Sequence, residues 1–267
     1  MYSNLRGGQA FDDEDVARAY AFRPPYPEAL IEFLVELSRH HRRALDLGCG
    51  TGKIAHALAP SFRQIDAVDP SAAMLRVAAG GRHANINWIH GFAESAALTG
   101  PYDLITAGAS IHWMDHPVVF RKLASVLNSA GVVAVIEGDQ AHEVPWQDDW
   151  ERFLARWLGR LGRDYNPAGF RDWMTAFRRW MEIGGTRLFE GRYTQAVEHF
   201  IECQHSRATW SRANLGDELV AEFDAELRDL LLPYADGGMI SFTTRSEVVW
   251  GRPLAASAAA SRQNPQT

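Results

Sequence analysis

The feature that most constrains this chain is a short apolar run that breaks into alternating glycines. It reads Ala44-Leu45-Asp46-Leu47-Gly48-Cys49-Gly50-Thr51-Gly52, and helix-compatible sequence follows it. The pattern predicts a buried strand, a tight glycine turn and the start of a helix. Glycine is needed where the backbone takes a positive φ, or where a ligand lies too close for a Cβ atom. The helix N-terminus offers unpaired N–H groups to such a ligand.

Two common nucleotide motifs fail at this turn. A phosphate-binding P-loop needs its first glycine where Leu47 stands and a Ser or Thr where Ile54 stands. A dinucleotide-binding turn needs a third glycine or alanine where Lys53 stands, for close packing of helix on strand. What remains is G-x-G-x-G, preceded two residues upstream by Asp46.

A second acid stands at the expected place. The next apolar run, residues 65–68, ends at Asp69, roughly 20 residues beyond the glycine turn. An acid at the end of the second strand can accept hydrogen bonds from ribose hydroxyls. The two acids and the glycine turn therefore favour a nucleoside-containing ligand.

These segments resemble the class I S-adenosylmethionine (SAM)-dependent methyltransferases. The matching residues are Leu45–Gly52 and Val68–Ser71, with Met74 and Leu75 behind them. The resemblance covers the first half of the chain well and the second half loosely. It implies an α/β fold with a Rossmann-like, seven-stranded, mostly parallel sheet and an inserted helical cap. It also implies SAM as cofactor and S-adenosylhomocysteine as product.

The resemblance assigns a set of residues to the cofactor. Phe92 stands where the family often has an acid that holds the adenine amine, so Phe92 would pack on the ring and the Ala93 N–H would bond the amine. Glu94 is expected to be a surface acid. The full cofactor-binding set is Arg23, Asp46, Gly48, Cys49, Gly50, Gly52, Asp69, Pro70, Met74, Phe92, Ala93 and Ala107.

A proline-rich segment precedes the first predicted helix of the core. Tyr20 and Arg23-Pro-Pro-Tyr26-Pro27 look like the N-terminal cover of the trans-aconitate methyltransferase-like branch. That resemblance implies that Arg23 binds the methionine carboxylate and that Tyr20 and Tyr26 bind substrate. The alternative is a proline turn that caps a helix, with Arg23 in solvent.

His112 and Trp113 follow the fourth apolar run, residues 102–107, and would face both cofactor and substrate. His112 is the candidate catalytic base, because imidazole titrates near neutral pH and can take a proton from an acceptor. Both residues are also candidates for substrate binding. Two alternatives stay open: His112 only hydrogen-bonds the loop or cofactor, or it binds metal with His116. The metal site is disfavoured because a zincin motif needs Glu where Trp113 stands, so we expect no metal.

The chain divides into five expected segments. They are N-terminal cover helices in 1–43, the SAM-binding Rossmann-like core in 44–139, a helical cap insertion including a late strand in 140–237, the final strand of the core sheet in 238–254, and a small, polar, disordered tail in 255–267.

Aromatic side chains dominate the cap. Apolar stripes in 146–158, 170–181 and 219–231 predict helices. Residues 189–197 and 239–250 are the candidates for the last two strands, which would pair antiparallel. Most of these aromatic residues would hold the cap on the core, and one or two would contact substrate.

Net charge, hydropathy and cysteine content restrict the classes of partner and the cellular compartment that we expect for this chain. The formal charge of −6 argues against nucleic acid, whose binding needs a basic stripe. No apolar run approaches the roughly 20 residues of a membrane span, and residues 1–11 lack the apolar region of a signal peptide. The 2 cysteines, Cys49 and Cys203, form no disulfide framework, so a reducing cytoplasm is expected. Oligomeric state is not predicted.

The resulting expectation is a methyltransferase that acts on a small molecule. The acceptor would be an apolar or aromatic metabolite methylated on O or N, or a carboxylate. The alternative is a protein that binds SAM without methylating, such as a cyclase or a ligand sensor. Methylation of base amino groups is disfavoured, because residues 108–111 lack the Asn/Asp-Pro-Pro-Tyr motif.

Overall fold

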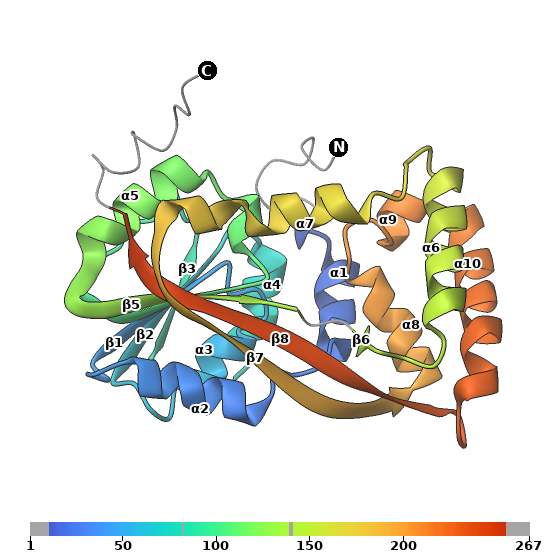
Figure 1. The fold of residues 1–267 in the computed structure, drawn as a ribbon, viewed down its shortest axis with the longest axis horizontal. Helices are drawn as coiled ribbons and strands as arrows, with labels where there is room; N and C mark the ends of the chain where they lie inside the picture. The colour runs from blue at the N-terminus through green and yellow to red at the C-terminus, as the bar shows by residue number, and fades with distance from the viewer. Residues whose placement is uncertain (1–10, 82, 139–140, 255–267) are drawn as a thin grey trace.

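The computed structural model describes residues 11–254 apart from 82, 139 and 140. The expected tail at 255–267 and the first ten residues of the expected cover lie outside the described residues. In the described part of the chain, a Rossmann-like layer lies on one side and a group of helices on the other (Figure 1). A long two-stranded ribbon joins them.

The sheet has the order β3-β2-β1-β4-β5-β8-β6, and β7 pairs with β8 outside this path. Strands β1 to β5 are parallel to one another, whereas β8 is antiparallel to β5, β6 and β7. This confirms the expected Rossmann-like, mostly parallel sheet, with the two-residue β6 as an eighth strand. The strands are β1 (Arg43–Leu47), β2 (Gln64–Asp69), β3 (Ile86–His90), β4 (Tyr102–Gly108), β5 (Leu127–Glu137), β6 (Ala141–His142), β7 (Met181–Ala196) and β8 (Met239–Pro253).

Helices cover both faces of the sheet because its central strands are apolar on both sides. Side chains that alternate along a strand enter opposite cores: Leu104 packs in the cluster with α2 and α3, and Ile105 in the cluster with α5. The helices of this layer are α2 (Glu28–Leu37), α3 (Lys53–Leu58), α4 (Ala72–Ala78) and α5 (His116–Val126).

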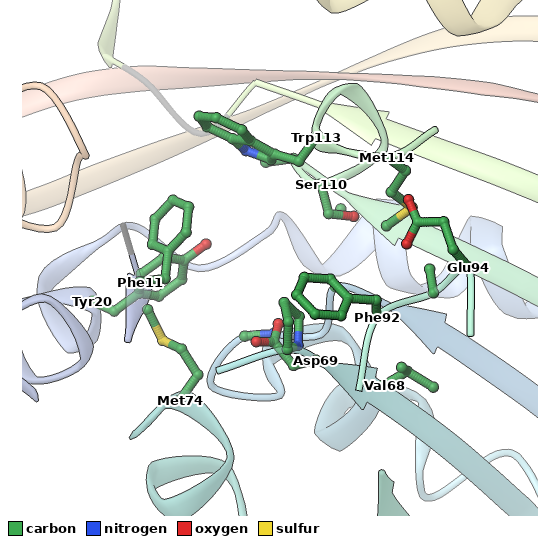
Figure 2. A pocket seen from close by; sticks show the side chains of 16 residues that line it. Phe11, Tyr20, Val68, Asp69, Met74, Phe92, Glu94, Ser110, Trp113 and Met114 are labelled. Carbon is green, nitrogen blue, oxygen red and sulfur yellow. The ribbon is translucent and has the colours of Figure 1, made fainter. Parts of the chain in front are cut away.

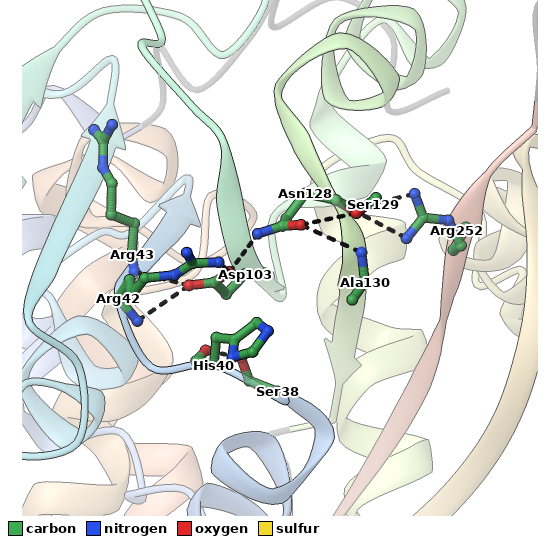
Figure 3. A network of polar contacts seen from close by, with 9 residues as sticks. All are labelled: Ser38, His40, Arg42, Arg43, Asp103, Asn128, Ser129, Ala130 and Arg252. Carbon is green, nitrogen blue, oxygen red and sulfur yellow. Dashed lines mark hydrogen bonds and ion pairs between the residues drawn. The ribbon is translucent and has the colours of Figure 1, made fainter.

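A polar network closes the edge of the sheet where the parallel strands begin (Figure 3). Asp103 accepts hydrogen bonds from the backbone N–H groups of Arg42 at 3.1 Å and Arg43 at 3.3 Å, and from Asn128 Nδ2 at 2.7 Å. Burial raises the pKa of Asp103, but a hydrogen bond from the Arg42 guanidinium at 3.3 Å together with these bonds outweighs it, so the pKa lies below its usual value. Arg252 donates to the carbonyl oxygen of Asn128 at 3.2 Å. The network therefore ties together the starts of β1, β4 and β5 and the end of β8.

The second half of the chain forms a helical cap with a core of its own. Trp146, Phe153, Trp157, Phe223 and Leu227 are buried together there, apart from the two cores of the sheet. The cap consists of α6 (Gln147–Arg160), α7 (Pro167–Thr175), the 3₁₀ turn η4 (Ala176–Trp180), α8 (Val197–His205), α9 (Arg212–Leu215) and α10 (Asp217–Leu231).

Strands β7 and β8 extend beyond the sheet as a ribbon that reaches the cap (Figure 1). Their antiparallel pairing was expected, but β7 begins at Met181 instead of residue 189. The apolar stripe at 170–181 is accordingly not one helix, because α7 ends at Thr175. The ribbon has one register shift, between Ile183 and Gly185, where an extra residue interrupts the ladder.

The N-terminal segment lies over the edge where the parallel strands end. It contains α1 (Glu14–Ala19) and the 3₁₀ turn η2 (Tyr20–Phe22), and α1 lies against α4 and α8. Lys53 at the start of α3 donates to the carbonyl oxygens of Arg23 at 2.6 Å and Pro24 at 3.2 Å. Among the described residues, no helix has the length and apolar character needed to cross a bilayer.

Candidate active site

The glycine turn follows β1 as expected, and each glycine has a positive φ: +61° at Gly48, +54° at Gly50 and +80° at Gly52. A Cβ on Gly48 would lie 2.5 Å from Ser110 Cβ, and one on Gly52 would lie 2.6 Å from the Trp88 ring. Close packing within the protein therefore requires two of the glycines, in addition to any ligand. Gly50 has no such contact, and its N–H donates to Asp69 Oδ2 at 2.8 Å.

Asp69 ends β2 beside this turn and is 7% exposed. Its second carboxylate oxygen accepts from the Ser71 N–H at 2.8 Å. Burial raises the pKa of Asp69, and the two backbone N–H groups partly oppose the rise. The side chain is thus fixed in orientation while its oxygens keep further acceptor capacity for hydroxyl groups.

A pocket opens between the glycine turn and the ends of β2 and β4, and we call it the glycine-turn pocket. Figure 2 shows Phe11, Tyr20 and Met74 on one side of it and Ser110, Met114 and Glu94 on the other. The lining residues are Phe11, Tyr20, Gly48, Gly50, Val68, Asp69, Pro70, Met74, Phe92, Ala93, Glu94, Gly108, Ala109, Ser110, Trp113 and Met114. The structure thus brings together seven of the expected cofactor residues, from Gly48 to Ala93.

A smaller pocket, the Asp46 pocket, adjoins it and shares Tyr20, Gly48 and Gly108. Its other lining residues are Arg23, Pro24, Tyr26, Asp46, Cys49, Lys53 and Ile54. Asp46 Oδ1 accepts from Thr106 Oγ1 at 2.9 Å, while Oδ2 is buried and has no hydrogen-bond partner among the described residues. Burial raises the pKa of Asp46 to about 7. Burial likewise raises the pKa of the Cys49 thiol above its usual value.

Arg23 lies at the wall of the Asp46 pocket and is only 8% exposed, which excludes the solvent-exposed alternative. Its Nε donates to Ser206 Oγ at 2.7 Å, and Nη2 donates to the Ser206 carbonyl oxygen at 2.9 Å. Its guanidinium also stacks on the Tyr20 ring at 4.1 Å. Arg23 thereby connects the N-terminal segment to the end of α8, where the helix dipole favours a cation.

Other expected site residues lie elsewhere. Ala107 is fully buried in the core of the sheet and lines neither pocket, because the chain turns towards the pocket only at Gly108 and Ala109. Gly52 is the residue before α3, next to the Trp88 ring, and it also lines neither pocket. Tyr26 lies beside Asp46 and not in the large cavity described next.

A large cavity of about 780 Å³ lies between the carboxyl ends of the strands and the cap. Phe11, Ala109 and Trp113 line both this cavity and the glycine-turn pocket, so the two spaces adjoin. Aromatic side chains of the cap form much of its wall: Trp146, Trp150, Tyr165, Phe170, Trp173, Phe200 and Trp210. Two or more of the expected cap aromatics are therefore placed to contact a bound molecule.

His112 lies in the 3₁₀ turn η3 (Ile111–Trp113) and lines the large cavity, but not the glycine-turn pocket. Its ring meets the Trp173 ring edge-on at 4.3 Å and lies 5.3 Å from the Trp113 ring. Among the described residues, no three His, Cys, Asp or Glu side chains gather as a metal site would need.

Sequence reasoning missed several lining residues. Phe11, Ser110 and Met114 reach the glycine-turn pocket from segments with no motif of their own. Glu94 was expected on the surface, but it lines the pocket and accepts from the Asp115 N–H at 2.8 Å. Lys53 carried one signal, its place directly after the glycine turn, where the N-terminus of a helix can bind an anionic group.

The two small pockets fit the chemistry of SAM. The Asp46 pocket offers an unpaired buried carboxylate oxygen for an ammonium group, and buried polar atoms are normally paired. The glycine-turn pocket offers Asp69 for ribose hydroxyls and flat or flexible apolar side chains, Phe92 and Met74, for a ring. A carboxylate at each end and an apolar middle match an amino acid joined to a nucleoside.

Comparisons with known proteins agree with this geometry. A family model described as a methyltransferase domain matches residues 44–131. A probable SAM-dependent methyltransferase of Saccharomyces cerevisiae is 31% identical over 159 residues, 53% of this chain and 55% of that protein. Trans-aconitate 2-methyltransferase of Deinococcus radiodurans is 36% identical over 100 residues, 36% of this chain and 38% of that enzyme. The chain thus spans about half or less of the length of these curated relatives.

A solved structure extends the likeness beyond the matched domain. A protein of Anaeromyxobacter dehalogenans, described as a candidate type II methyltransferase, superposes with a TM-score of 0.67 and 25% identity. The superposition covers 86% of this chain and 97% of that one. Sheet order, glycine turn, buried acids and sequence matches agree that residues 44–131 form a methyltransferase domain similar to those of the class I SAM-dependent methyltransferases.

Proposed function

We propose that this protein transfers the methyl group of SAM to a small molecule held in the large cavity. The observation that carries the proposal is the junction of three spaces. The Asp46 pocket adjoins the glycine-turn pocket, which in turn adjoins the cavity through Phe11, Ala109 and Trp113. A donor in the two small pockets and an acceptor in the large one would meet at that junction.

The site residues have distinct proposed roles. Asp69 holds the ribose hydroxyls, and Asp46 accepts from the ammonium group of the methionine part. Met74 and Phe92 pack on adenine, and the Ala93 N–H bonds its amine. Arg23 stays a candidate for the methionine carboxylate, although its bonds to Ser206 leave it shared between the pocket and the cap.

SAM supplies an activated methyl group, so the protein's own contribution is positioning. Holding acceptor and donor in line converts a bimolecular encounter into a nearly unimolecular step, which supplies much of the acceleration. The cap lines the cavity with aromatic side chains, and an acceptor bound there would displace water, which strengthens electrostatic interactions around it. His112 remains a candidate base or an orienting ring at the cavity wall.

The acceptor class follows from the cavity. Its volume of about 780 Å³ and its aromatic wall favour an apolar or aromatic small molecule, methylated on O or N. A carboxylate is the rival, since one matched relative is named as a trans-aconitate methyltransferase. The formal charge of −6 speaks against a nucleic-acid substrate.

Calorimetric titration with S-adenosylhomocysteine tests the donor site. Asp69→Ala should weaken binding at least about 100-fold, because two hydroxyl hydrogen bonds to a charged group are lost. Asp103→Ala is the matched control, because it removes a buried acid from the opposite edge of the sheet and should leave affinity within about 3-fold. Wild-type protein that releases no heat with this compound, and shows no thermal shift, would refute the proposal.

A SAM-binding protein without methyl transfer is the second candidate. The same fold can hold SAM as a sensor or a cyclase, and the donor pockets alone do not distinguish these functions. Production of S-adenosylhomocysteine with any acceptor separates the candidates. Tight binding without product across a panel of phenols, alcohols, amines and carboxylates would favour the non-methylating candidate.

A further inference from the structure

The large cavity contains one acid among its described lining residues, Glu137. Its cationic lining residues are Arg23, Arg171, Arg207 and Arg245. Three of these are engaged elsewhere: Arg23 bonds Ser206, Arg245 pairs with Glu190 at 2.6 Å, and Arg207 has a partner of its own. A lone carboxyl group in an aromatic cavity needs a reason, because burying a carboxylate away from partners is unfavourable.

Glu137 lies close to the junction with the donor pocket. It is the last residue of β5, and the carbonyl oxygen of the preceding residue, Ile136, accepts from the Ala109 N–H at 2.8 Å. Ala109 lines both the glycine-turn pocket and the cavity. The end of β5 therefore adjoins the wall that the two spaces share at Ala109.

The surroundings of Glu137 leave its carboxyl group poised to exchange a proton. Its Oε1 is buried and has no hydrogen-bond partner among the described residues. Arg178, the cation whose charge acts on Glu137, pairs with Glu247. Burial and the charge of Glu247 raise the pKa of Glu137 to about 7, although Arg178 opposes the rise. The other charged or titratable residues that line the cavity are Arg23, His112, His142, Tyr165, Arg171, Cys203, Arg207 and Arg245.

His112 has a different environment on the neighbouring strand end. Its ring is held among Trp113 and Trp173 by edge-on and tilted contacts. These contacts suit a ring that shapes the acceptor's position.

We propose that Glu137 is the catalytic base of the site and that the cavity takes a neutral acceptor with a removable proton, a phenol or an alcohol. The proposal rests on the proposed function and narrows it. A carboxylate acceptor would arrive ionised, would need no base, and would meet the negative charge of Glu137 near the donor.

The step balances as follows. The acceptor's oxygen forms a bond to the methyl carbon while the carbon–sulfur bond breaks and its electron pair stays on sulfur. The hydroxyl proton passes to the Glu137 carboxylate. The products are a neutral methyl ether, a neutral thioether and a protonated Glu137, which returns its proton to water after the product leaves.

Binding of matched probes tests the assignment without relying on turnover. Three biphenyls of similar shape are compared: 4-phenylphenol, its methyl ether, and biphenyl-4-carboxylate, with S-adenosylhomocysteine saturating. Quenching of tryptophan fluorescence reports binding, because Trp146, Trp150, Trp173 and Trp210 line the cavity. At pH 8 the wild type should bind the phenol at least about 10-fold tighter than the ether, since a hydrogen bond to a charged carboxylate is strong. The preference should shrink at pH 6, where Glu137 holds its proton.

Three variants complete the test. Glu137→Leu should lose the preference for the phenol, and Glu137→Gln should keep part of it but lose its pH dependence. His112→Phe should keep both the preference and its pH dependence. In turnover with any phenol that is methylated, Glu137→Gln should reduce kcat at least about 100-fold, the usual contribution of a general base.

Several outcomes would overturn the assignment. Tightest binding by the carboxylate, equal binding of phenol and ether, no binding of any probe, or loss of the preference in His112→Phe alone would each do so. Unchanged S-adenosylhomocysteine affinity in the Glu137 variants shows that they are folded. If the wild type fails to bind that compound at all, it is the proposed function that fails.

Discussion

The two edges of the same sheet differ in how their buried acids are paired, apart from Asp69, which accepts from two backbone N–H groups at the edge where the strands end. At the edge where the strands begin, Asp103 accepts from two backbone N–H groups and Asn128, and Asp66 accepts from Arg43 at 2.7 Å and Tyr102 at 2.6 Å. At the edge where they end, Asp46 and Glu137 each keep a buried carboxyl oxygen without a partner among the described residues.

The difference indicates which edge of the sheet carries the functional site. Paired acids hold strands together, and pairing keeps the pKa of Asp103 low. Unpaired acids are unfavourable for folding, and their pKa values rise, as they do for Asp46 and Glu137. Perturbed groups of this kind gather where a protein needs to bind or transfer charge. Both lie at the carboxyl edge, the crevice side of open α/β sheets.

The largest expected effect is that of Asp46→Asn on the pH dependence of the free energy of unfolding. The folded pKa is about 7, above the unfolded value of about 3.9, so the folded state binds more protons and stability falls as pH rises through this window. From pH 5 to pH 7 this one group should account for about 2–3 kcal/mol of that fall. Urea denaturation of both proteins at pH 5, 6, 7 and 8 measures it. Identical slopes in variant and wild type would contradict the idea that the edge holds an uncompensated acid.

Asp103→Ala tests the opposite edge. It leaves the backbone N–H groups of Arg42 and Arg43 and the amide of Asn128 without their shared acceptor, so the free energy of unfolding at pH 7 should fall by about 2–3 kcal/mol. Because the folded pKa is depressed, the wild-type contribution is present above the unfolded pKa and is lost as pH falls through the folded value. Urea denaturation from pH 7 downward shows both effects. A variant as stable as the wild type would mean that the network does not hold the strands.

Ser206→Ala should have the smallest effect. It sharpens the comparison because it removes one hydrogen bond near the carboxyl edge, the bond from Arg23 to the Ser206 hydroxyl. The Arg23 Nε loses its acceptor at 2.7 Å but Nη2 keeps the carbonyl oxygen of residue 206. We expect a loss of about 1 kcal/mol in urea denaturation and a change in S-adenosylhomocysteine affinity below about 3-fold. A change in affinity above 10-fold on the same calorimeter would show that the cap controls the donor site through Arg23.

The Rossmann-like half could be predicted because its signals are local. The glycine turn, the acid that ends β2 and the apolar strands each occupy a few consecutive residues, and each has one structural solution. Asp69, Met74 and Phe92 therefore reach the pocket that the sequence indicated. Ala107 was misplaced by a short distance along the chain, since the pocket begins only where Gly108 leaves the strand.

The remainder depends on contacts that are distant in sequence. The first part of β7 is mostly exposed between Glu182 and Leu188, so it lacks the apolar signal of a buried strand, and its pairing with β8 decides its structure. Glu94 reaches the pocket because Asp115 holds it there. The unpaired oxygens of Asp46 and Glu137 carry no sequence signal, because an absent partner is visible only once the fold has formed.

The ribbon of β7 and β8 has a mechanical consequence. Both strands run from the sheet to the cap as one hydrogen-bonded ladder, so the roof over the acceptor cannot swing on a flexible connector. The one register shift of that ladder, between Ile183 and Gly185, lies opposite Trp250 and Gly251, which also pair with β5, so it falls within the sheet and the arm towards the cap is uninterrupted. Entry and exit of acceptors would then require the arm to bend along its length, beyond the part that β5 holds in the sheet.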